Sequence, residues 1–231
     1  MWQQLVTCTA FVQHVSTMSR IVLVVRDPAL ALQWRSELSA GSHEVVAVTN
    51  GARAAQALLQ QHRPQLVICD LRLIDGTALA MIQWLGLQAQ RPLVLAVARD
   101  DSEALLLEAL RAGADNLCVW TDGASPLAAC TEQTLRGETT IPAPIARALF
   151  DHFERSHAQL GRHRRPGDEQ GALELEAPQR ELLIRLAAGY DIELLARAQN
   201  VSPRVLGQRL RAVVRKLQWD VRAGALTLQL S

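Results

Sequence analysis

The sequence predicts an α/β domain followed by an all-α domain. Short apolar runs alternate with helical patterns from residue 21 to residue 136, which is typical of a parallel sheet with helices on both faces. From residue 175 onward, apolar residues recur only at helical spacing. With 231 residues, 49% of them hydrophobic, the chain has room for two domains that each bury a core.

The charged residues are unevenly distributed along the chain, although the net charge is only +1. Residues 20–138 contain ten basic and thirteen acidic residues, whereas residues 175–231 contain nine basic and five acidic residues. A mildly acidic first part and a basic second part suit a regulatory domain joined to a nucleic-acid binder.

The cysteine spacing gives no sign of a metal site or a redox motif. Cys8, Cys69, Cys118 and Cys130 form no CxxC or metal-ligand pattern, which favours reduced thiols in a cytoplasmic protein. No apolar run is long enough to span a membrane, and no cofactor is expected.

Residues 1–18 are predicted to be an N-terminal extension. They have no basic head and no small-residue cleavage site, so they make a poor signal peptide. Met18 directly precedes the first predicted strand and is an alternative translation start, so residues 1–17 are expected to be loosely ordered.

Five strands and five helices are predicted to alternate in the first domain, residues 19–138. The strands are expected at Ile21–Val25, Glu44–Thr49, Gln65–Cys69, Leu93–Ala98 and Asn116–Val119. The helices are expected at Pro28–Ser39, Ala52–Gln61, Gly76–Leu87, Ser102–Ala112 and Pro126–Arg136. In such folds ligands bind at the carboxyl ends of the strands. The residues expected there are Val25, Arg26, Asp27, Asp70, Val97, Ala98 and Trp120.

Residues 139–172 are predicted to be a linker that contains a helix at 145–153. Its last part, LGRHRRPGDEQG from residue 160 to residue 171, is charged, contains Gly and Pro and has no apolar period, which predicts a flexible tether. The basic cluster at residues 162–165 is expected to be solvated, with contact to DNA phosphates as the alternative.

Three helices followed by a fourth are predicted in the last domain, residues 173–231. The first ends at Gly189, and the second runs from about Asp191 to Gln199. The third begins with Ser202 as its N-cap and Pro203 at the first helical position. The fourth is an amphipathic helix at residues 221–230.

The third helix is apolar on one face and basic on the other. Its apolar residues are Leu206, Leu210, Val213, Val214 and Leu217. Its opposite face carries Arg204, Gln208, Arg209, Arg211, Arg215 and Lys216, with no acid from residue 202 to residue 217. A short-turn helix pair with such a second helix is typical of a helix-turn-helix that reads DNA, although a solvated amphipathic helix has the same pattern.

Residues 175–217 resemble the DNA-binding domain of the LuxR/FixJ/NarL type, without a gap. Three positions depart from that family: Glu176 replaces a Thr, Ile192 replaces a polar turn residue, and Gly207 replaces a Lys on the recognition helix. Gly207 costs about 1 kcal/mol of helix propensity relative to Ala and removes one DNA contact. The matching residues are Arg180, Glu181, Leu183, Leu186, Ala187, Gly189, Ala196, Val201, Ser202, Leu210, Arg215, Lys216 and Leu217.

The resemblance implies duplex DNA as a partner, and a homodimer supported by the last helix. Gln208 and Arg211 are predicted to read bases, Gln toward adenine and Arg toward guanine. The residues predicted to hold phosphates are Arg204, Arg209, Arg215 and Lys216.

Residues from about 20 to 138 resemble a response-regulator receiver domain, a flavodoxin-like five-stranded parallel sheet. The resemblance rests on PQLVICDLRL at residues 64–73, Asp75-Gly76, and ALRAGAD at residues 109–115. It places Asp70 at the phosphoryl-accepting carboxylate. It also implies two acids after the first strand that help hold Mg²⁺, a hydroxyl after the fourth strand and a Lys after the fifth.

Those accompanying positions carry other residues in this chain. Val25 and Arg26 replace the acidic pair, with Asp27 one place beyond, and Val97 and Trp120 replace the hydroxyl and the Lys. The only lysine of the chain is Lys216, in the last domain. The sequence therefore predicts a receiver that has lost phosphorylation and kept its fold.

Arg26 is predicted to form an ion pair with Asp70 in this degenerate pocket, and Trp120 to pack at an edge used for subunit contact. Two alternatives stay open: a working phosphoacceptor with Asp27 as a metal ligand, and a pocket that binds a small anion through Arg26.

Together, these features predict a transcriptional regulator that binds duplex DNA through a LuxR-type helix-turn-helix and is not controlled by phosphorylation. The alternatives are a phosphorylation-dependent two-component response regulator that uses Asp70, and a protein that sequesters another regulator without specific DNA binding. Another regulator or RNA polymerase is considered as a protein partner. An enzyme is not expected, because no nucleophile–base pair, metal cluster or phosphate loop is present.

Overall fold

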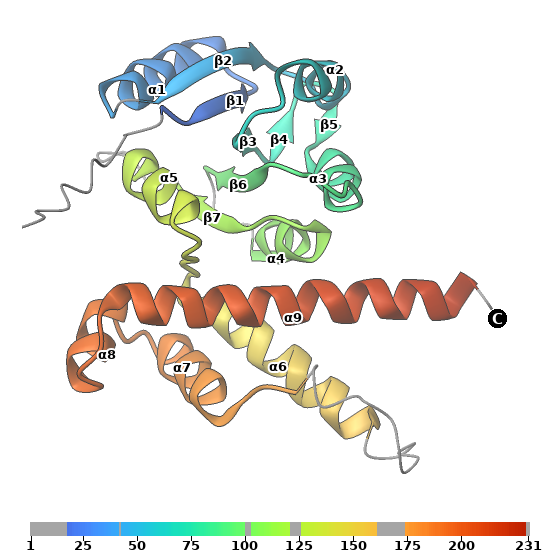
Figure 1. Ribbon diagram of the computed structural model, residues 1–231. Helices are drawn as coiled ribbons and strands as arrows, with labels where there is room; N and C mark the ends of the chain where they lie inside the picture. Colours follow the sequence, from blue (N-terminus) through green and yellow to red (C-terminus); the bar gives the residue numbers. More distant parts are fainter. Residues whose placement is uncertain (1–17, 42, 100–102, 121–125, 161–173, 230–231) are drawn as a thin grey trace, which may run out of the picture.

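The computed structural model describes residues 18–41, 43–99, 103–120, 126–160 and 174–229. Residues 20–135 form an α/β unit around a five-stranded parallel sheet, in the order β2-β1-β3-β6-β7 (Figure 1). This order is the flavodoxin-like arrangement that the sequence predicts. The strands are β1 Arg20–Val24, β2 Glu44–Thr49, β3 Leu66–Asp70, β6 Leu93–Ala98 and β7 Asn116–Val119.

Helices cover both faces of the sheet, because successive strand residues point to opposite sides. Along β1, Ile21 and Leu23 belong to one buried apolar cluster, and Val22 and Val24 belong to another. The first cluster lies under α1 (Pro28–Ala40) and α5 (Leu127–Leu135). The second lies under α2 (Ala52–His62), α3 (Leu79–Gly86) and α4 (Glu103–Ala112).

The helix predicted from Gly76 begins only at Leu79. The preceding residues form a short antiparallel hairpin, β4 Arg72–Leu73 and β5 Gly76–Thr77. Gly76 has φ 129°, which no helix contains. The Asp75 carboxylate instead caps α2, accepting from the N–H groups of Ala52 at 2.9 Å and Arg53 at 3.2 Å.

The remaining helices form a second unit: α6 Ala143–Leu160, α7 Ala177–Ala187, α8 Ile192–Ala198 and α9 Pro203–Gln229. α6 is longer than the predicted helix at 145–153. The predicted fourth helix is not separate, since α9 continues past Leu217 and meets no Gly or Pro until Gly224. The tether predicted at residues 160–171 and the extension at residues 1–17 lie almost wholly outside the described residues.

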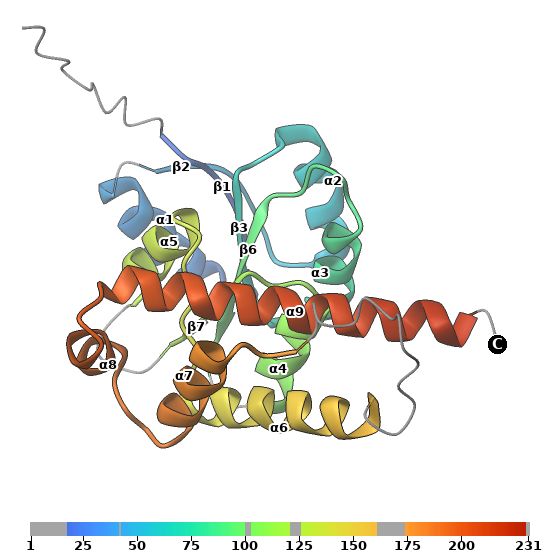
Figure 2. The ribbon, with the colours of Figure 1, turned by 60° about the horizontal axis from the view of Figure 1, so that its bottom comes forward.

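In Figure 1, α9 lies between the α/β unit and helices α6 and α7, and Figure 2 shows that α4 extends past α9 toward α6. The buried apolar cluster under α3 and α4 continues into the helical unit, where it includes Ile145, Leu149, Leu206 and Leu210. The two units therefore share apolar contacts, and α9 packs against the α/β unit as well as against helices of its own unit.

Within the described ranges, no helix combines the length and apolarity needed to cross a membrane. The same residues contain no group of three or more side chains placed to hold a metal ion. Cys69, Cys118 and Cys130 are buried free thiols.

Candidate functional site

Asp70 ends β3 at the carboxyl edge of the sheet, where its partner on β6 is Val97. Its side chain is almost fully buried, with 3% of the residue exposed. Arg99, just after β6, places Nη2 3.1 Å from Oδ2, and the Arg72 N–H donates to Oδ1 at 3.1 Å. Burial raises the pKa of Asp70, and these two partners offset that rise only in part.

The predicted ion pair between Arg26 and Asp70 is wrong. The Arg26 side chain is exposed, and among the described contacts the ion pair of Asp70 is with Arg99. Only the backbone of Arg26 reaches the pocket, where its N–H helps to lower the pKa of Asp70, while the next residue, Asp27, caps α1 by accepting from the Ala29 N–H at 2.9 Å.

The other predicted pocket positions are occupied by packing residues. Val25 and Val97 are buried in the core and present no polar atom. The Trp120 ring lies 5.6 Å from the Trp34 ring at an interplanar angle of 37° and packs against the cluster under α1 and α5. A cavity of about 160 Å³ beside Asp70 is lined by Arg72, Arg99, Leu71, Ala98 and Leu105.

The helical unit forms the predicted helix-turn-helix. Asp191 caps α8 by accepting from the Glu193 N–H at 2.7 Å, and Asn200 takes the left-handed conformation, φ 53°, in the turn before α9. Lys216 on α9 donates to the Glu174 carbonyl at 2.8 Å and to Gln179 Oε1 at 2.9 Å, at the start of α7. Lys216 thus joins α9 to α7 in this structure.

The predicted basic face of α9 is divided between solvent and protein contacts. Arg204, Gln208 and Arg215 are exposed, and Arg204 Nε lies 3.7 Å from Glu138 Oε1. Arg209 donates to Gln199 Oε1 at 3.0 Å. Arg211, in contrast, has 6% of its surface exposed. The placement of Arg211 on the outer face is therefore wrong for this conformation, and its contact with a base stays a prediction.

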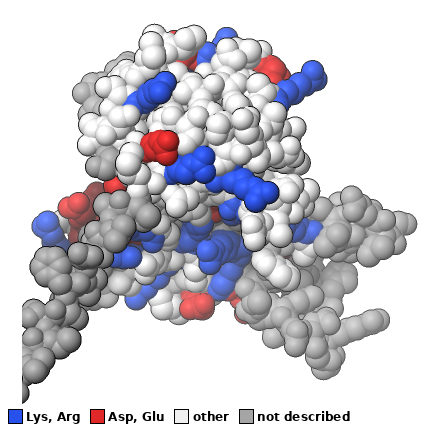
Figure 3. All heavy atoms as spheres, turned by 45° about the horizontal axis from the view of Figure 1, so that its top comes forward, with Lys and Arg blue, Asp and Glu red and all other residues white. Residues whose placement is uncertain are grey.

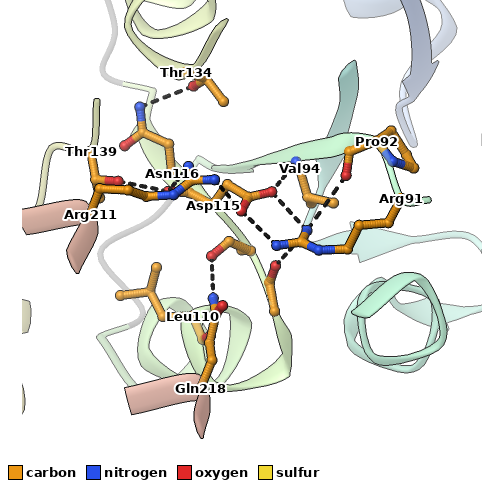
Figure 4. A network of polar contacts seen from close by, with 12 residues as sticks. Arg91, Pro92, Val94, Leu110, Asp115, Asn116, Thr134, Thr139, Arg211 and Gln218 are labelled. Atoms are coloured by element: carbon orange, nitrogen blue, oxygen red, sulfur yellow. Dashed lines mark hydrogen bonds and ion pairs between the residues drawn. The ribbon is translucent and has the colours of Figure 1, made fainter. Parts of the chain in front are cut away.

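Arg211 is buried because it reaches Asp115, directly before β7 (Figure 4). Its Nη2 lies 2.6 Å from Oδ1, and its Nη1 donates to the Asp115 carbonyl at 3.1 Å. From the opposite side, Arg91 holds both carboxylate oxygens at 2.7 and 2.8 Å. The Val94 N–H donates to Oδ2 at 2.7 Å. We call the side chains of Asp115, Arg91 and Arg211 the Asp115 cluster.

Burial lowers the pKa of the Arg211 guanidinium, Arg215 and Arg91 add to the effect, and Asp115 opposes it. Arginine nevertheless stays charged in proteins, so the cluster contains two cations and one anion.

Two further α9 side chains bond to the ends of receiver-side helices. Gln218 Nε2 donates to the carbonyls of Leu110 at 3.1 Å and Ala114 at 2.8 Å, at the end of α4. Arg222 Nη2 donates to the Gly86 carbonyl at 3.0 Å, at the end of α3. Helix ends leave such carbonyls without partners, and their partial negative charge favours a cation.

Two glycines allow this close approach. A Cβ on Gly207 would lie 3.1 Å from the Glu138 Cβ, and a Cβ on Gly86 would lie 2.9 Å from Arg222 Nη2. The Gly207 carbonyl accepts the Thr139 N–H at 3.1 Å. The loss of the usual Lys at position 207 therefore coincides with tight packing of α9 against residues 138–139.

Sequence reasoning missed Arg99, Arg91, Asp115, Gln218 and Arg222. The contacts of Arg211, Gln218 and Arg222 did leave a pattern in the sequence. Together with Gly207 these residues are separated by 4, 7 and 4 positions and so share one face of α9. This face was not recognised as buried because it carries Gly, Arg and Gln, whereas a buried helix face is expected to be apolar.

Comparisons with known proteins agree with this architecture. Residues 21–119 match the family model of the response regulator receiver domain. The α/β unit is therefore similar to response regulator receiver domains. No curated protein matches the sequence.

The solved structures most useful for comparison have the same two-part fold. A structure of two RcsB dimers bound to two parallel DNAs has a TM-score of 0.51 and 14% identity, covering 87% of this chain and 96% of that one. RcsB from Salmonella enterica serovar Typhimurium, bound to promoter P1flhDC, has a TM-score of 0.50 and 18% identity, with coverages of 87% and 92%.

A LuxR-family two-component response regulator from Aurantimonas sp. SI85-9A1 has a TM-score of 0.52 and 23% identity. The match covers 57% of this chain and 94% of that one. These similarities establish the fold: a flavodoxin-like receiver domain followed by a helical region.

Proposed function

We propose that this protein is a transcriptional regulator that binds duplex DNA through α9, as a homodimer, and that phosphorylation does not control its receiver domain. The proposed DNA-binding domain is residues 173–231, and residues 139–172 are the proposed linker. The observation that carries the proposal is the α7–α9 arrangement, in which a capped α8 and a turn at Asn200 present a basic α9.

The charge distribution supports nucleic acid as the partner. On the face drawn in Figure 3, Lys and Arg side chains lie close together across the middle and lower part of the molecule, and separate basic and acidic side chains lie in the upper part. The side chains of Arg204, Gln208 and Arg215 on α9 are exposed to solvent in this conformation. RcsB, of similar fold, has been solved with bound DNA, and we extend that partner to this chain.

The conformation described here is a closed form. A major groove about 12 Å wide admits an α-helix only if that helix stands free on its outer side. α9 lies instead against the receiver domain, with Arg211 and Gln218 buried there. In the proposed function, α9 leaves the receiver domain before Gln208 and Arg211 read bases.

The Asp70 pocket supports independence from phosphorylation. Arg99 forms an ion pair with Oδ2 of Asp70, and the side chains of Val25 and Val97 offer no ligand for a metal ion or phosphoryl group. The chain has no second lysine to place beside Asp70. A phosphoryl group on Asp70 would therefore lack both its usual metal site and its usual lysine partner.

A salt-titrated DNA-binding experiment tests the proposal. Fragments are first selected from genomic DNA with the full-length protein, and affinities are then measured by fluorescence anisotropy. Arg215→Ala is expected to weaken binding to all sequences and to reduce the salt slope by about 1. Gln208→Ala is expected to cost about 1–3 kcal/mol on selected DNA only. Arg35→Ala, on an exposed face of α1, is the matched control.

A protein that sequesters another regulator is the second candidate, because Arg211 is buried and Gly207 replaces a DNA contact. DNA binding by the wild type and by the Asp115→Ala variant distinguishes the two functions. The variant removes the carboxylate that accepts the hydrogen bond of Arg211. Binding of selected DNA by the wild type or this variant, with the expected salt slope, supports the regulator. Its absence in both supports sequestration and overturns the DNA-binding proposal.

A further inference from the structure

The Asp115 cluster has more positive than negative charge. Arg91 and Arg211 share a single carboxylate, and Arg215 adds a third positive charge near Arg211. Asp115 and Arg211 are buried, with side-chain exposures of 2% and 7%. At low effective dielectric, two guanidinium groups repel each other, and one carboxylate balances only one of them.

A groove of about 790 Å³ opens on the outer side of Arg91. It lies at the amino-terminal edge of the sheet, between the loop before β3 and the loop before β6, away from Asp70. The part of the chain that lines it includes two arginines, Arg63 and Arg91, and no acid. Four glutamines and the half-buried Trp84 supply hydrogen-bonding groups and a flat apolar surface.

Arg91 lines the groove and keeps its Nε–H donor without a hydrogen-bond partner among the described residues. Its Nη1 and Nη2 atoms bond to Asp115 and to the carbonyls of Pro92 and Gly113. Arg63 is exposed, in the left-handed conformation at the end of α2, φ 43°. The groove thus presents two cationic side chains and no competing carboxylate.

We propose that this groove binds a small organic anion, whose carboxylate or phosphate accepts from Arg63 and Arg91 and whose flat apolar part lies on Trp84. The anion balances the excess charge of the Asp115 cluster. Repulsion between Arg91 and Arg211 then weakens, so Arg211 docks more firmly on Asp115. The occupied groove therefore stabilises the closed form, and by linkage it weakens the DNA binding proposed above.

Binding is tested without DNA, so that it stands or falls independently of the proposed function. The probes are phenyl phosphate and benzoate, titrated into the full-length protein by calorimetry at constant ionic strength, with benzyl alcohol as the uncharged control. Saturable binding of at least one anion and none of benzyl alcohol is expected. Arg63→Asn keeps a residue that tolerates the left-handed conformation, and should weaken binding about tenfold by removing a charged hydrogen bond.

Arg35→Gln on α1 should leave the affinity unchanged. The two anions also distinguish a phosphate site from a carboxylate site. No saturable binding of either anion, or the same affinity in Arg63→Asn as in the wild type, would overturn the site.

The coupling has its own measurement. The Thr139 N–H donates to the Gly207 carbonyl, so its hydrogen exchange reports on docking of α9. A saturating anion should slow exchange at residues 138–140 by about threefold, the ratio of its affinities for the closed and open forms. Asp115→Ala should lose this effect. Unchanged exchange in the wild type with the groove occupied would overturn the link to α9.

Discussion

Two aspartates lie at opposite edges of the receiver sheet, and each accepts an arginine. At the carboxyl edge, Asp70 pairs with Arg99, which follows the neighbouring strand β6 and is itself 39% exposed. At the amino-terminal edge, Asp115 pairs with Arg91 of the same domain and with Arg211 of α9. The first pair lies within one domain, whereas the second cluster joins two.

The difference shows where a signal could act in this protein. The Asp70 pair connects only neighbouring loops, so its loss changes little beyond the pocket. The Asp115 cluster is buried between domains and holds the helix proposed to bind DNA, so its loss changes the relative position of α9. In the proposed function, the contacts that hold α9 therefore lie at the edge opposite Asp70.

Asp115→Ala should have the largest effect. It leaves the buried Arg211 without its acceptor, and we expect a loss of about 3 kcal/mol in the free energy of unfolding. It should also increase hydrogen exchange along residues 203–222. Chemical denaturation and exchange mass spectrometry measure the two effects. Asp151→Ala, at an exposed position of α6, is the control. Unchanged exchange along α9 would contradict the role given to the cluster.

Gly207→Lys should have the next largest effect. It introduces the Lys that the resemblance to LuxR-type domains places there, but its Cβ would lie 3.1 Å from the Glu138 Cβ, so Glu138 or α9 must shift by a few tenths of an ångström and the docking of α9 is weakened. We expect about tenfold tighter binding to selected DNA, corresponding to about 1.4 kcal/mol.

Gln208→Lys is the charge-matched control for hydrogen exchange and for binding to random DNA, and it is not compared on selected DNA because Gln208 is proposed to read a base. It adds the same charge one residue later, at an exposed position, and meets no receiver residue. A gain in general DNA affinity is expected from both variants because each adds a phosphate contact. Faster exchange at residues 138–140 is expected from Gly207→Lys alone. Equal exchange in both variants would show that Gly207 does not limit docking.

Asp70→Asn should change stability only slightly, by less than about 1 kcal/mol at neutral pH, because Arg99 remains partly solvated. The pH dependence is more informative. Burial raises the pKa of Asp70 in the folded protein above its ordinary value of about 3.9. The folded state therefore keeps the proton to higher pH than the unfolded state, and wild-type stability falls as the pH rises from about 3.9 to the pKa of the folded protein. The variant lacks this fall, so the wild type should lose its advantage with rising pH. A wild-type advantage that grows with pH would contradict the raised pKa.

Much of the fold could be predicted from the sequence, because strand and helix periods are local. The five strands of the sheet and the helix-turn-helix follow directly from apolar spacing. The partner of Asp70 could not be predicted in the same way. Arg26 and Arg99 both follow strands at the same edge, and the sequence does not show that Arg26 contributes its backbone N–H while Arg99 contributes its side chain.

The docking of α9 was also beyond sequence reasoning. Arg211 and Gln218 find their acceptors 96 and 104 residues earlier in the chain, and nothing local to α9 specifies them. The same spacing that predicts a DNA-facing stripe also fits a protein-facing one. The tertiary contacts decide between them, since Gly207 packs closely against Glu138 and the side chains of Arg211 and Gln218 are buried.

Phosphodonors should have the smallest effect of all, because we expect them to change neither the oligomeric state nor the DNA affinity. A phosphoryl group at Asp70 would compete with the Arg99 ion pair, and it would find neither an acid pair at Val25 and Arg26 after β1 nor a lysine at Trp120 after β7. Acetyl phosphate or beryllofluoride with Mg²⁺ should therefore leave both the oligomeric state, by light scattering, and DNA affinity unchanged. Asp70→Asn should bind DNA within about twofold of the wild type, a fraction of a kcal/mol. Stoichiometric aspartyl phosphate accompanied by a gain in DNA affinity would restore Asp70 as the switch, and the carboxyl edge as the regulatory edge of this receiver.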